Sequence, residues 1–315
     1  MKQQLLLSSE KIKAEALSLG FSACGLAPAE PVADWRMEKM SRWLAEGKQG
    51  EMDYLLRHAP LRTDPCHVME GVQTVISVAL NYYPAASLSP EGYALARYAY
   101  GRDYHDVVRE KLRLLLQALS LEEHVEARIC CDTAPLDERY WAWRCGLGWQ
   151  GRNALFIIPG RGTYHFLGEI LCRYKADAYD LPLTAADASP CKDCRRCIDA
   201  CPAGALSEHE GLDARRCLSY LTIEHHGPLP PGAARQMGRC IYGCDRCAEA
   251  CPHNHAPRPT GEPAFAPSEE LCRMTTADWQ SLSPDTYRRL FKGSAVKRAK
   301  YEGLVRNIRT LGEQE

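Results

Sequence analysis

The stretch between Cys191 and Cys251 constrains the fold of this chain more than any other part of it. Its first run places Cys191, Cys194, Cys197 and Cys201 at Cys-x2-Cys-x2-Cys-x3-Cys spacing, and a proline follows the last cysteine. Thiolates are soft ligands, and such short spacings let one loop wrap around a cube of iron and sulfide. The fourth cysteine of such a run normally serves a neighbouring cluster. The run therefore predicts a pair of [4Fe–4S] clusters of the bacterial ferredoxin kind.

A second run supports this interpretation but leaves its ligands ambiguous. It contains Cys240, Cys244, Cys247 and Cys251, and again a proline follows the last cysteine. With Cys217, nine cysteines lie between 191 and 251, one more than two clusters require. The motif by itself assigns Cys240 to the second run.

Zinc and disulfide bonds are the alternative uses of these cysteines. Structural zinc sites use Cys-x2-Cys pairs, but three cysteines followed by Cys-Pro are unusual for them. Disulfide bonds are disfavoured because the cysteines stand at metal-ligand spacing and the N-terminal residues 1–4 predict a polar helix rather than an export signal. With 16 cysteines, we expect a reducing compartment and take the cytoplasm as the location. No apolar run is long enough to cross a bilayer.

Hydrophobic periodicity predicts a mixed α+β chain of ordinary soluble composition. A continuous apolar run at 72–81 is typical of a buried strand, and 154–158 and 163–172 predict two strands joined as a hairpin. Further strands are expected at 21–26 and 125–131. Helices are expected at 11–19, 34–45, 51–58, 106–119, 137–145, 276–282 and 285–291. The segment 177–190 is rich in Ala, Asp and Pro and predicts a linker.

Three segments outside the cysteines carry candidate functional groups. Asp132 follows a predicted strand, where functional side chains are often presented, although a carboxylate there can equally serve as a turn or helix cap. The glycine-rich turn 146–153 lets the backbone approach a ligand or turn tightly. The segment 292–309 is basic, which indicates either a solvated helix face or a phosphate-contacting patch. The formal net charge of -1 predicts that any nucleic-acid contact depends on such a local patch.

Several short segments of the chain, taken together, resemble those of one family. The resemblance covers about residues 8–309 and rests on seven short segments: 50–54, 98–105, 132–135, 146–153, 166–170, 216–224 and 241–244. On these residues the chain resembles the epoxyqueuosine reductases, cobalamin-dependent enzymes that complete queuosine in tRNA. The resemblance implies a nitroreductase-related, cobalamin-binding sheet domain at 1–180. It also implies a ferredoxin-like domain with two [4Fe–4S] clusters at 181–262 and a short basic helical tail at 263–315.

The resemblance also implies a ligand assignment. Cluster one would use Cys191, Cys194, Cys197 and Cys251, and cluster two would use Cys201, Cys217, Cys244 and Cys247. Cys240 would then be a spare thiol. Cobalamin would be bound in its base-off form, held mainly by surrounding contacts. Those contacts would fall on Arg57, Arg97, Tyr98, Asp132, Phe156, Leu167, Ile170, Ser219, Cys244 and Asp245.

The implied reaction reduces epoxyqueuosine to queuosine at the wobble position of tRNA, with Asp132 as proton donor. Burial over the corrin face is expected to raise the pKa of Asp132 so that the carboxyl group keeps its proton. Electrons would come singly through the clusters from an unidentified donor, and a monomer is expected. The implied tRNA contacts are Arg215, Arg216, His226, Lys297, Arg298 and Arg306.

Two other functions fit part of the sequence. A reductive dehalogenase-like cobalamin enzyme acting on a small molecule would share the cofactors. An electron-transfer ferredoxin with an appended binding domain would explain the clusters but leave Asp132, the glycine-rich turn and the aromatic segment 96–105 without a purpose.

Overall fold

A computed structural model describes residues 6–185, 190–209 and 211–313 of the 315-residue chain. The N-terminal residues 1–4 and part of the predicted linker, 186–189, lie outside the described residues. The α-helices are α1 Ser9–Ser18, α2 Asp34–Ala45, α3 Tyr54–His58, α4 Tyr104–Ala118, α5 Glu138–Arg144, α6 Arg196–Asp199, α7 Leu218–Ile223, α8 Ala233–Met237, α9 Arg246–Glu249, α10 Glu269–Arg273, α11 Thr276–Gln280, α12 Pro284–Leu290 and α13 Lys300–Gly312.

The strands are β1 Leu6–Leu7, β2 Ala23–Pro28, β3 Thr74–Asn81, β4 Ala94–Leu95, β5 Ala127–Cys130, β6 Trp149–Gln150, β7 Phe156–Ile157, β8 His165–Cys172, β9 Lys175–Ala176, β10 Leu206–Ser207, β11 Gly211–Leu212 and β12 Cys240–Tyr242. Four of them form the central sheet in the order β2-β3-β8-β5, with antiparallel neighbours throughout. The remaining strands form short two-stranded pairs.

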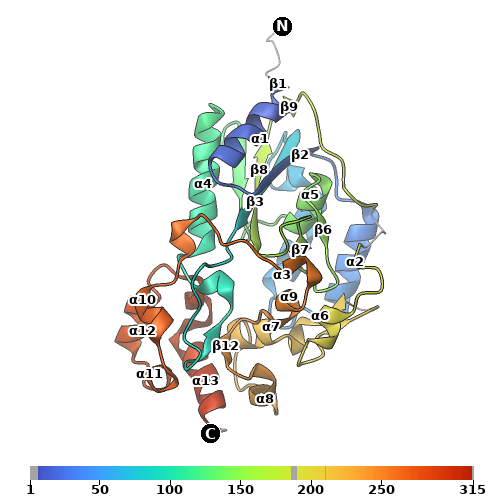
Figure 1. The fold of residues 1–315 in the computed structure, drawn as a ribbon. Helices are drawn as coiled ribbons and strands as arrows, with labels where there is room; N and C mark the ends of the chain where they lie inside the picture. Colours follow the sequence, from blue (N-terminus) through green and yellow to red (C-terminus); the bar gives the residue numbers. More distant parts are fainter. Residues whose placement is uncertain (1–5, 186–189, 210, 314–315) are drawn as a thin grey trace.

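The central sheet is buried on both faces, and β3 shows how the sequence produces this. Successive side chains of a strand point to opposite faces. Ile76, Val78 and Leu80 pack with α1 and α4 on one face. Val75 and Ala79 pack with α5 and β7 on the other. The apolar run is therefore continuous rather than alternating, and the prediction of a buried strand here is confirmed (Figure 1).

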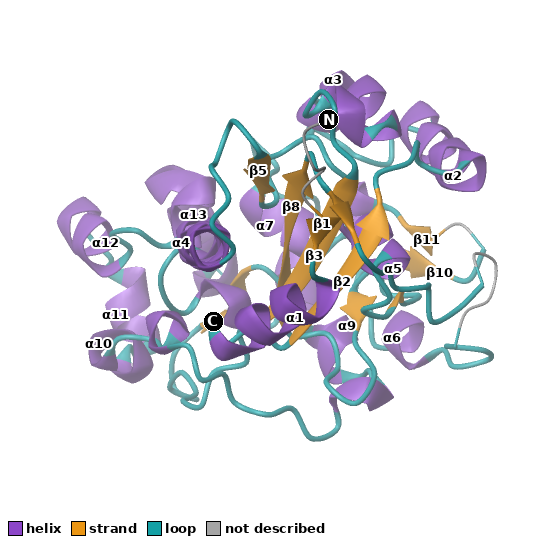
Figure 2. Cartoon of the chain, turned by 90° about the horizontal axis from the view of Figure 1, so that it is seen from above, coloured by secondary structure: helices purple, strands orange, loops and turns teal. Residues whose placement is uncertain are grey.

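A second core holds the cysteine-rich segment and the C-terminal helices together. It joins Tyr93 and Leu95 to side chains of α7, α8, β12 and α10–α13. Figure 1 shows these elements below the sheet, with the two ends of the chain at opposite ends of the molecule. The parallel pair β12–β4 connects this lower unit to the segment that leads into α4. Figure 2, seen from above, shows the central sheet between α4 and α5.

The predicted hairpin between 154–158 and 163–172 is wrong. β7 pairs with β6, and β8 joins the central sheet instead; only an isolated bridge links Ile158 to Gly162. The reason is the glycine-rich turn. A Cβ at Gly148 would lie 2.0 Å from the carbonyl oxygen of Ile157, so only glycine allows β6 to approach β7 this closely.

Most helices occur where periodicity placed them, with ends shifted by a few residues. The helix predicted at 34–45 is confirmed at both ends, whereas the one predicted at 51–58 begins only at Tyr54. The segment before the cysteines is fastened to the first unit. Asp180 accepts hydrogen bonds from Lys13 Nζ at 2.6 Å and from the Leu26 backbone at 2.9 Å.

Candidate functional site

Asp132 stands two residues beyond the end of β5, in a backbone conformation that turns it away from the sheet. Its φ is +52°, a region that aspartate tolerates better than most residues. The preceding Cys131 is buried, and its thiol donates to the Leu167 carbonyl oxygen at 3.8 Å. The Asp132 backbone N–H donates to the Glu138 carboxylate. These bonds fix the residue while its side chain stays 54% exposed.

The start of α4 brings His105 and Tyr104 to Asp132, and Asp103 holds the far side of the His105 ring. Asp103 caps the helix by accepting the His105 N–H at 3.0 Å, and its Oδ1 also lies 2.6 Å from His105 Nδ1. The other ring nitrogen, Nε2, lies 2.9 Å from Asp132 Oδ2. Tyr104 also hydrogen-bonds to Asp132, and its ring stacks on His105 and Phe166 with centroid separations of 4.0 and 4.2 Å. The imidazole is thus held between two carboxylates.

These contacts reverse the expected protonation of Asp132. Burial alone would raise its pKa, but the hydrogen bond and charge of His105 outweigh that effect and lower it. Burial likewise opposes the charge on His105, yet Asp103 and Asp132 raise the pKa of His105 to about 9. The expectation of a raised Asp132 pKa is therefore wrong for this structure, and the shared proton resides on the imidazole at neutral pH.

Two carboxyl groups behind Asp132 escaped the sequence analysis. Burial, followed by the charge of Asp132, raises the pKa of Glu138 to about 8. Glu169 on β8 is fully buried, and burial and the charge of Glu138 raise its pKa well above normal. Ser77 Oγ donates to Glu169 Oε1 at 3.2 Å, whereas Oε2 has no hydrogen-bond partner in the described part of the chain. A glutamate inside a buried strand run was the signal that could have found this group.

The second group of predicted residues meets below the sheet. The backbone N–H of Arg97 and its guanidinium donate to Asp245 Oδ2 at 2.8 and 3.2 Å, and the guanidinium also reaches Glu249 at 2.7 Å. Tyr98 donates to the Tyr242 hydroxyl at 3.3 Å. The β4–β12 pairing brings these segments together. A Cβ at Gly243 would lie 2.5 Å from the Ala96 Cβ, so the approach requires glycine there.

The remaining predicted cobalamin contacts are more scattered. Phe156 and Leu167 are neighbours in one apolar cluster and are 6% and 9% exposed. Ile170 is fully buried on the opposite face of the sheet, against α1 and α4, so its side chain does not reach them. Arg57 is exposed at the end of α3, and Ser219 lies in α7 beside Cys217.

The thiols predicted for cluster one share a cavity. Its volume is about 80 Å³, and its walls include Arg152, Asn153 and Ile157 as well as four cysteines. Those cysteines are Cys191, Cys194, Cys197 and Cys251. The set joins the first run to the last cysteine of the second run. A four-thiol cavity of this kind fits an iron–sulfur cluster.

The thiols predicted for cluster two are also neighbours, whereas Cys240 is engaged elsewhere. Burial raises the pKa of Cys247, and a further contribution comes from nearby thiols, which are those of Cys244, Cys217, Cys197 and Cys201. The charge of the Cys244 thiol, after burial, also raises the pKa of Cys240. Its thiol donates to the carbonyl oxygens of Gly243 at 3.0 Å and Tyr242 at 3.6 Å. These contacts fit Cys217 better than Cys240 as a ligand.

Among the predicted tRNA contacts, Arg298 lies close enough to Asp132 for the charge of that carboxylate to act on it. It donates to both carboxylate oxygens of Glu224 at 2.9 and 2.8 Å and lies 5.7 Å over the Tyr54 ring. Burial and then the charges of Glu224 and Asp132 raise the pKa of Tyr54, and the charge of Asp132 also contributes to the raised pKa of Arg298.

The other predicted tRNA contacts have varied surroundings. Arg306 donates to the carbonyl oxygens of Leu221, His225 and Gly227, so it holds the loop after α7. His226 lies 2.8 Å from Glu51, and Arg215 pairs with Asp213. Arg216 and Lys297 are exposed.

The two four-thiol sets below a helix-covered antiparallel sheet define the class: an α+β iron–sulfur protein with a double-cluster, ferredoxin-like unit. Residues 190–254 match the family model of the 4Fe-4S double cluster binding domain, and residues 62–133 match that of epoxyqueuosine reductase QueG. The epoxyqueuosine reductase of Cyclobacterium marinum is 38% identical over 303 residues, which are 94% of each chain. This chain belongs to the epoxyqueuosine reductase family.

Two solved structures are similar over nearly the whole chain. One is an epoxyqueuosine reductase with an epoxyqueuosine-modified tRNA-Tyr stem loop, 26% identical with a TM-score of 0.85. The other is the Bacillus subtilis epoxyqueuosine reductase with its catalytic aspartate loop swung out of the active site, 26% identical with a TM-score of 0.82. Each match covers 96% of this chain and 80% of the other. None of the helices in the described part of the chain is long and apolar enough to span a membrane.

Proposed function

We propose that this chain reduces epoxyqueuosine in tRNA to queuosine, the last step of queuosine formation. The observation that carries the proposal is the Asp103–His105–Asp132 arrangement, in which a proton is stored next to an exposed carboxylate. A relative of this family is known in complex with an epoxyqueuosine-modified stem loop. A ferredoxin without a substrate site has no use for this arrangement. The dehalogenase alternative has no support beyond shared cofactors.

The epoxyqueuosine reductases use cobalamin and two [4Fe–4S] clusters. When bound, low-valent cobalamin supplies the reducing power for breaking the carbon–oxygen bond, and the clusters supply electrons one at a time. His105 would not serve as a ligand to such a cobalamin, because both of its ring nitrogens are already engaged by Asp103 and Asp132. We propose that Asp132, Phe156, Leu167 and the Arg97–Asp245 pair line its site. The side chain of Ile170 lies on the opposite face of the sheet and is not part of this proposed site.

Proton delivery is the task we assign to the protein. Reduction of the epoxide to an alkene consumes two electrons and two protons, and the oxygen leaves as water. An alkoxide is a poor leaving group, so the oxygen must be protonated as the bond breaks. His105 holds one proton at neutral pH and can pass it to Asp132 when bound substrate removes water from the carboxylate. Glu138, with a pKa of about 8, is placed to resupply the site.

We propose the ligand sets Cys191, Cys194, Cys197 and Cys251 for cluster one and Cys201, Cys217, Cys244 and Cys247 for cluster two.

For the tRNA, we propose contacts from Arg298 and the exposed Arg216 and Lys297, with Arg215 and His226 nearby. Arg306 acts by positioning the loop at 225–227. To test this, the affinity for the tRNA stem loop is compared in two variants. We expect Arg306→Lys, which still offers a donor to the loop carbonyl oxygens, to bind close to the wild-type level, and Arg306→Gln to bind more weakly.

Four further features remain predictions. They are a nitroreductase-related sheet unit, the division of the chain into 1–180, 181–262 and 263–315, a monomer and a cytoplasmic location. The tail at 263–315 packs into the same core as the cluster unit, so we expect these two parts to fold together.

The decisive experiment is turnover by the full chain. Protein loaded anaerobically with both clusters and cobalamin is mixed with dithionite and an epoxyqueuosine-containing tRNA stem loop, and the nucleosides are measured by mass spectrometry. We expect conversion to queuosine. Fully loaded protein that leaves epoxyqueuosine unchanged would show that the proposed function is wrong.

A further inference from the structure

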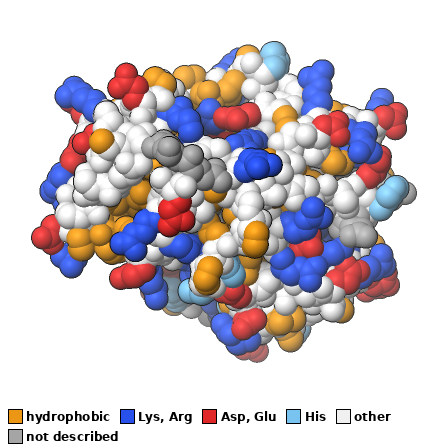
Figure 3. All heavy atoms as spheres, turned by 90° about the horizontal axis from the view of Figure 1, so that it is seen from below, with side chains coloured by type: hydrophobic (Ala, Val, Ile, Leu, Met, Phe, Trp, Pro, Cys, Tyr) orange, Lys and Arg blue, Asp and Glu red, His pale blue; other side chains and the backbone are white. Residues whose placement is uncertain are grey.

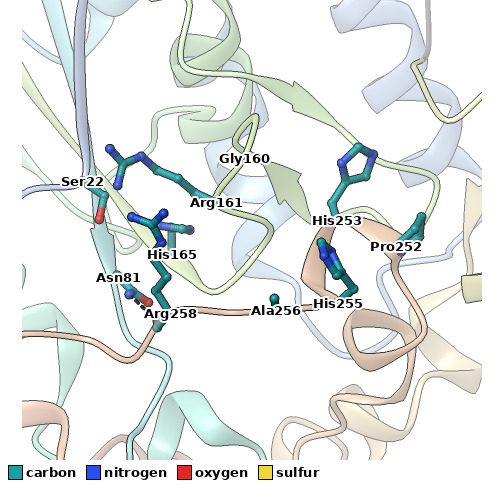
Figure 4. Close-up of a pocket in the computed structure, with 10 residues that line it drawn as sticks. All are labelled: Ser22, Asn81, Gly160, Arg161, His165, Pro252, His253, His255, Ala256 and Arg258. Carbon is teal, nitrogen blue, oxygen red and sulfur yellow. Dashed lines mark hydrogen bonds between the residues drawn. The ribbon is translucent and has the colours of Figure 1, made fainter.

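A basic cavity lies on the side of the molecule where β2 and β3 meet the loop after the last cysteine. Its volume is about 170 Å³. Figure 4 shows Arg161, His165 and Arg258 along one side, with His253 and His255 facing them across the opening. None of the residues that line it carries a carboxylate. The proposed tRNA, cobalamin and cluster functions make no use of it.

The positive charge of this cavity is uncompensated. Arg161 and Arg258 are exposed, and neither guanidinium forms an ion pair or hydrogen bond among the described residues. Most other arginines near the clusters are paired, as Arg152 and Arg195 are with Glu208. His165 Nδ1 is buried and has no hydrogen-bond partner in the described structure. Burial and the charge of Arg161 lower the pKa of His165 to about 4, so it offers a neutral ring.

The walls of the cavity are held in place by a buried asparagine. Asn254 Oδ1 accepts the Thr163 N–H at 2.8 Å, and its Nδ2 donates to Thr163 Oγ1 and the Ala248 carbonyl oxygen, both at 2.7 Å. It thereby ties the turn that carries Arg161 to the loop that carries His253 and His255. The Arg258 carbonyl oxygen accepts from Asn81 Nδ2 at 2.8 Å, which ties the third wall to β3. These bonds hold the backbone segments that carry the basic side chains in a defined arrangement around the cavity.

The basic cavity also adjoins the four-thiol cavity. Pro252 and His253 line both, and they directly follow Cys251. Trp149 packs edge-on against His253 with ring centroids 5.3 Å apart. A molecule that binds the basic cavity therefore sits next to the position proposed for cluster one.

We propose that this cavity, walled by Arg161, His165, His253, His255 and Arg258, is the docking site for an acidic electron-carrier protein, which places a carboxylate between the two arginines and delivers electrons to cluster one. The inference rests on the proposed position of that cluster. Because the whole chain has a net charge of -1, attraction of an acidic protein must come from such a local group of charges. Each turnover needs two electrons and the clusters accept them one at a time, so a one-electron carrier must bind, transfer its electron and leave twice per turnover, which suits electrostatic docking.

The test measures reduction of the clusters in the full, cluster-loaded chain by two reductants. The first is a reduced acidic [2Fe–2S] ferredoxin, followed by stopped-flow absorbance at several salt concentrations, and the second is dithionite. The variant is Arg161→Gln/Arg258→Gln, and the control is Arg288→Gln, an exposed arginine on α12. At low salt we expect the double variant to lower the ferredoxin rate constant about tenfold and flatten its salt dependence. Dithionite reduction and iron content should not change.

The outcomes separate this inference from the proposed function. If the double variant keeps the rate and salt dependence of the wild type and of Arg288→Gln, the docking site is wrong. The same holds if the double variant loses affinity for the tRNA stem loop while ferredoxin reduction is unaffected, because the cavity would then bind RNA. Failure of dithionite-driven turnover in wild-type protein would overturn the proposed function alone, since cluster reduction by ferredoxin is measured without tRNA.

Discussion

At the scale of single residues, the shared proton of His105 and Asp132 decides the chemistry available at the site. Asp103 and Asp132 each favour the charged form of the His105 imidazole, and together they outweigh the cost of burying that charge. Asp132 rests as an anion that water can reach. When a substrate covers it, the anion loses solvation and the proton of His105 becomes available to it. An aspartate with a low resting pKa can therefore still act as the immediate donor.

Asp132→Asn tests this role directly. The amide keeps the shape of the side chain but cannot deliver a proton, so we expect turnover to fall by about 10²- to 10⁴-fold. Iron content, cobalamin uptake and affinity for the tRNA stem loop should stay at wild-type levels. Single-turnover kinetics with dithionite measure the chemical step. Wild-type turnover by the loaded variant would remove Asp132 from the mechanism.

His105 gives the enzyme a pH dependence with a defined sign. Its pKa is raised in the folded state, so its contribution to stability is complete below the unfolded value of about 6.5 and is lost as pH rises through about 9. We expect the thermal midpoint of the wild type, and its turnover, to fall between pH 7 and about 9.5. His105→Asn should flatten the stability profile over this range. His124→Asn, a change at an 80% exposed histidine, is the control, and equal slopes for both variants would contradict the assignment.

At the scale of elements, the question of which cysteine completes cluster two is a choice between Cys217, next to α7, and Cys240, in β12. Cys217 immediately precedes α7, close to Cys247, whereas Cys240 begins β12 with its thiol bonded to backbone carbonyl oxygens. Cys217→Ser should lose about half of the bound iron, because one of two clusters lacks a ligand. Cys240→Ser should keep all of it. Iron and sulfide assays after anaerobic reconstitution measure the cluster content of both variants. Loss of iron only in Cys240→Ser would show that Cys240, not Cys217, is the ligand.

The turn between β7 and β8 provides a matched pair of glycines. Gly160 and Gly162 both have positive φ, at +69° and +78°. A Cβ at Gly162 would lie 2.0 Å from Asn254 Oδ1, whereas a Cβ at Gly160 meets nothing within 4 Å. Gly160→Ala should cost about 1 kcal/mol in unfolding free energy, the usual strain of this conformation. Gly162→Ala should cost more, about 3 kcal/mol, because it also breaks the Asn254 contacts. Chemical denaturation measures both, and equal costs would show that Asn254 does not brace the turn.

The sequence predicted the elements whose burial follows from a local pattern of residues. It missed the strand pairing and the pKa shift that depend on residues distant in the chain. The buried run of β3 and the amphipathic α2 were readable because periodicity alone determines their burial. The β6–β7 pairing was missed because it depends on glycines whose effect appears only when another backbone arrives. The position of Asp132 was predicted, but the sign of its pKa shift was not, because His105 lies 27 positions away. Glu169 was hidden within an apolar run.

At the scale of the whole molecule, much of the charge outside the basic cavity is neutralised by neighbouring side chains of opposite sign. Figure 3 shows basic and acidic side chains interspersed over the face seen from below. Several arginines of the predicted tRNA surface are paired or bonded to backbone, as Arg298 is to Glu224 and Arg306 to the loop after α7. We therefore expect the chain to bind tRNA through a few contacts near Asp132 rather than through a broad basic field, and to bind with a modest salt dependence.

Arg298→Gln tests where the RNA lies. Arg298 lies over the Tyr54 ring, and the charge of Asp132 acts on both groups, so a phosphate held by Arg298 would keep the modified base in the neighbourhood of the carboxylate. Removing one phosphate contact should weaken binding of the stem loop several-fold and reduce the slope of log affinity against log salt by about 0.7 to 1. Arg273→Gln, at a 79% exposed arginine on α10, is the control. Fluorescence anisotropy with a labelled stem loop gives both quantities. An unchanged slope would mean that Arg298 only positions Glu224, and that the RNA approaches Asp132 from another side.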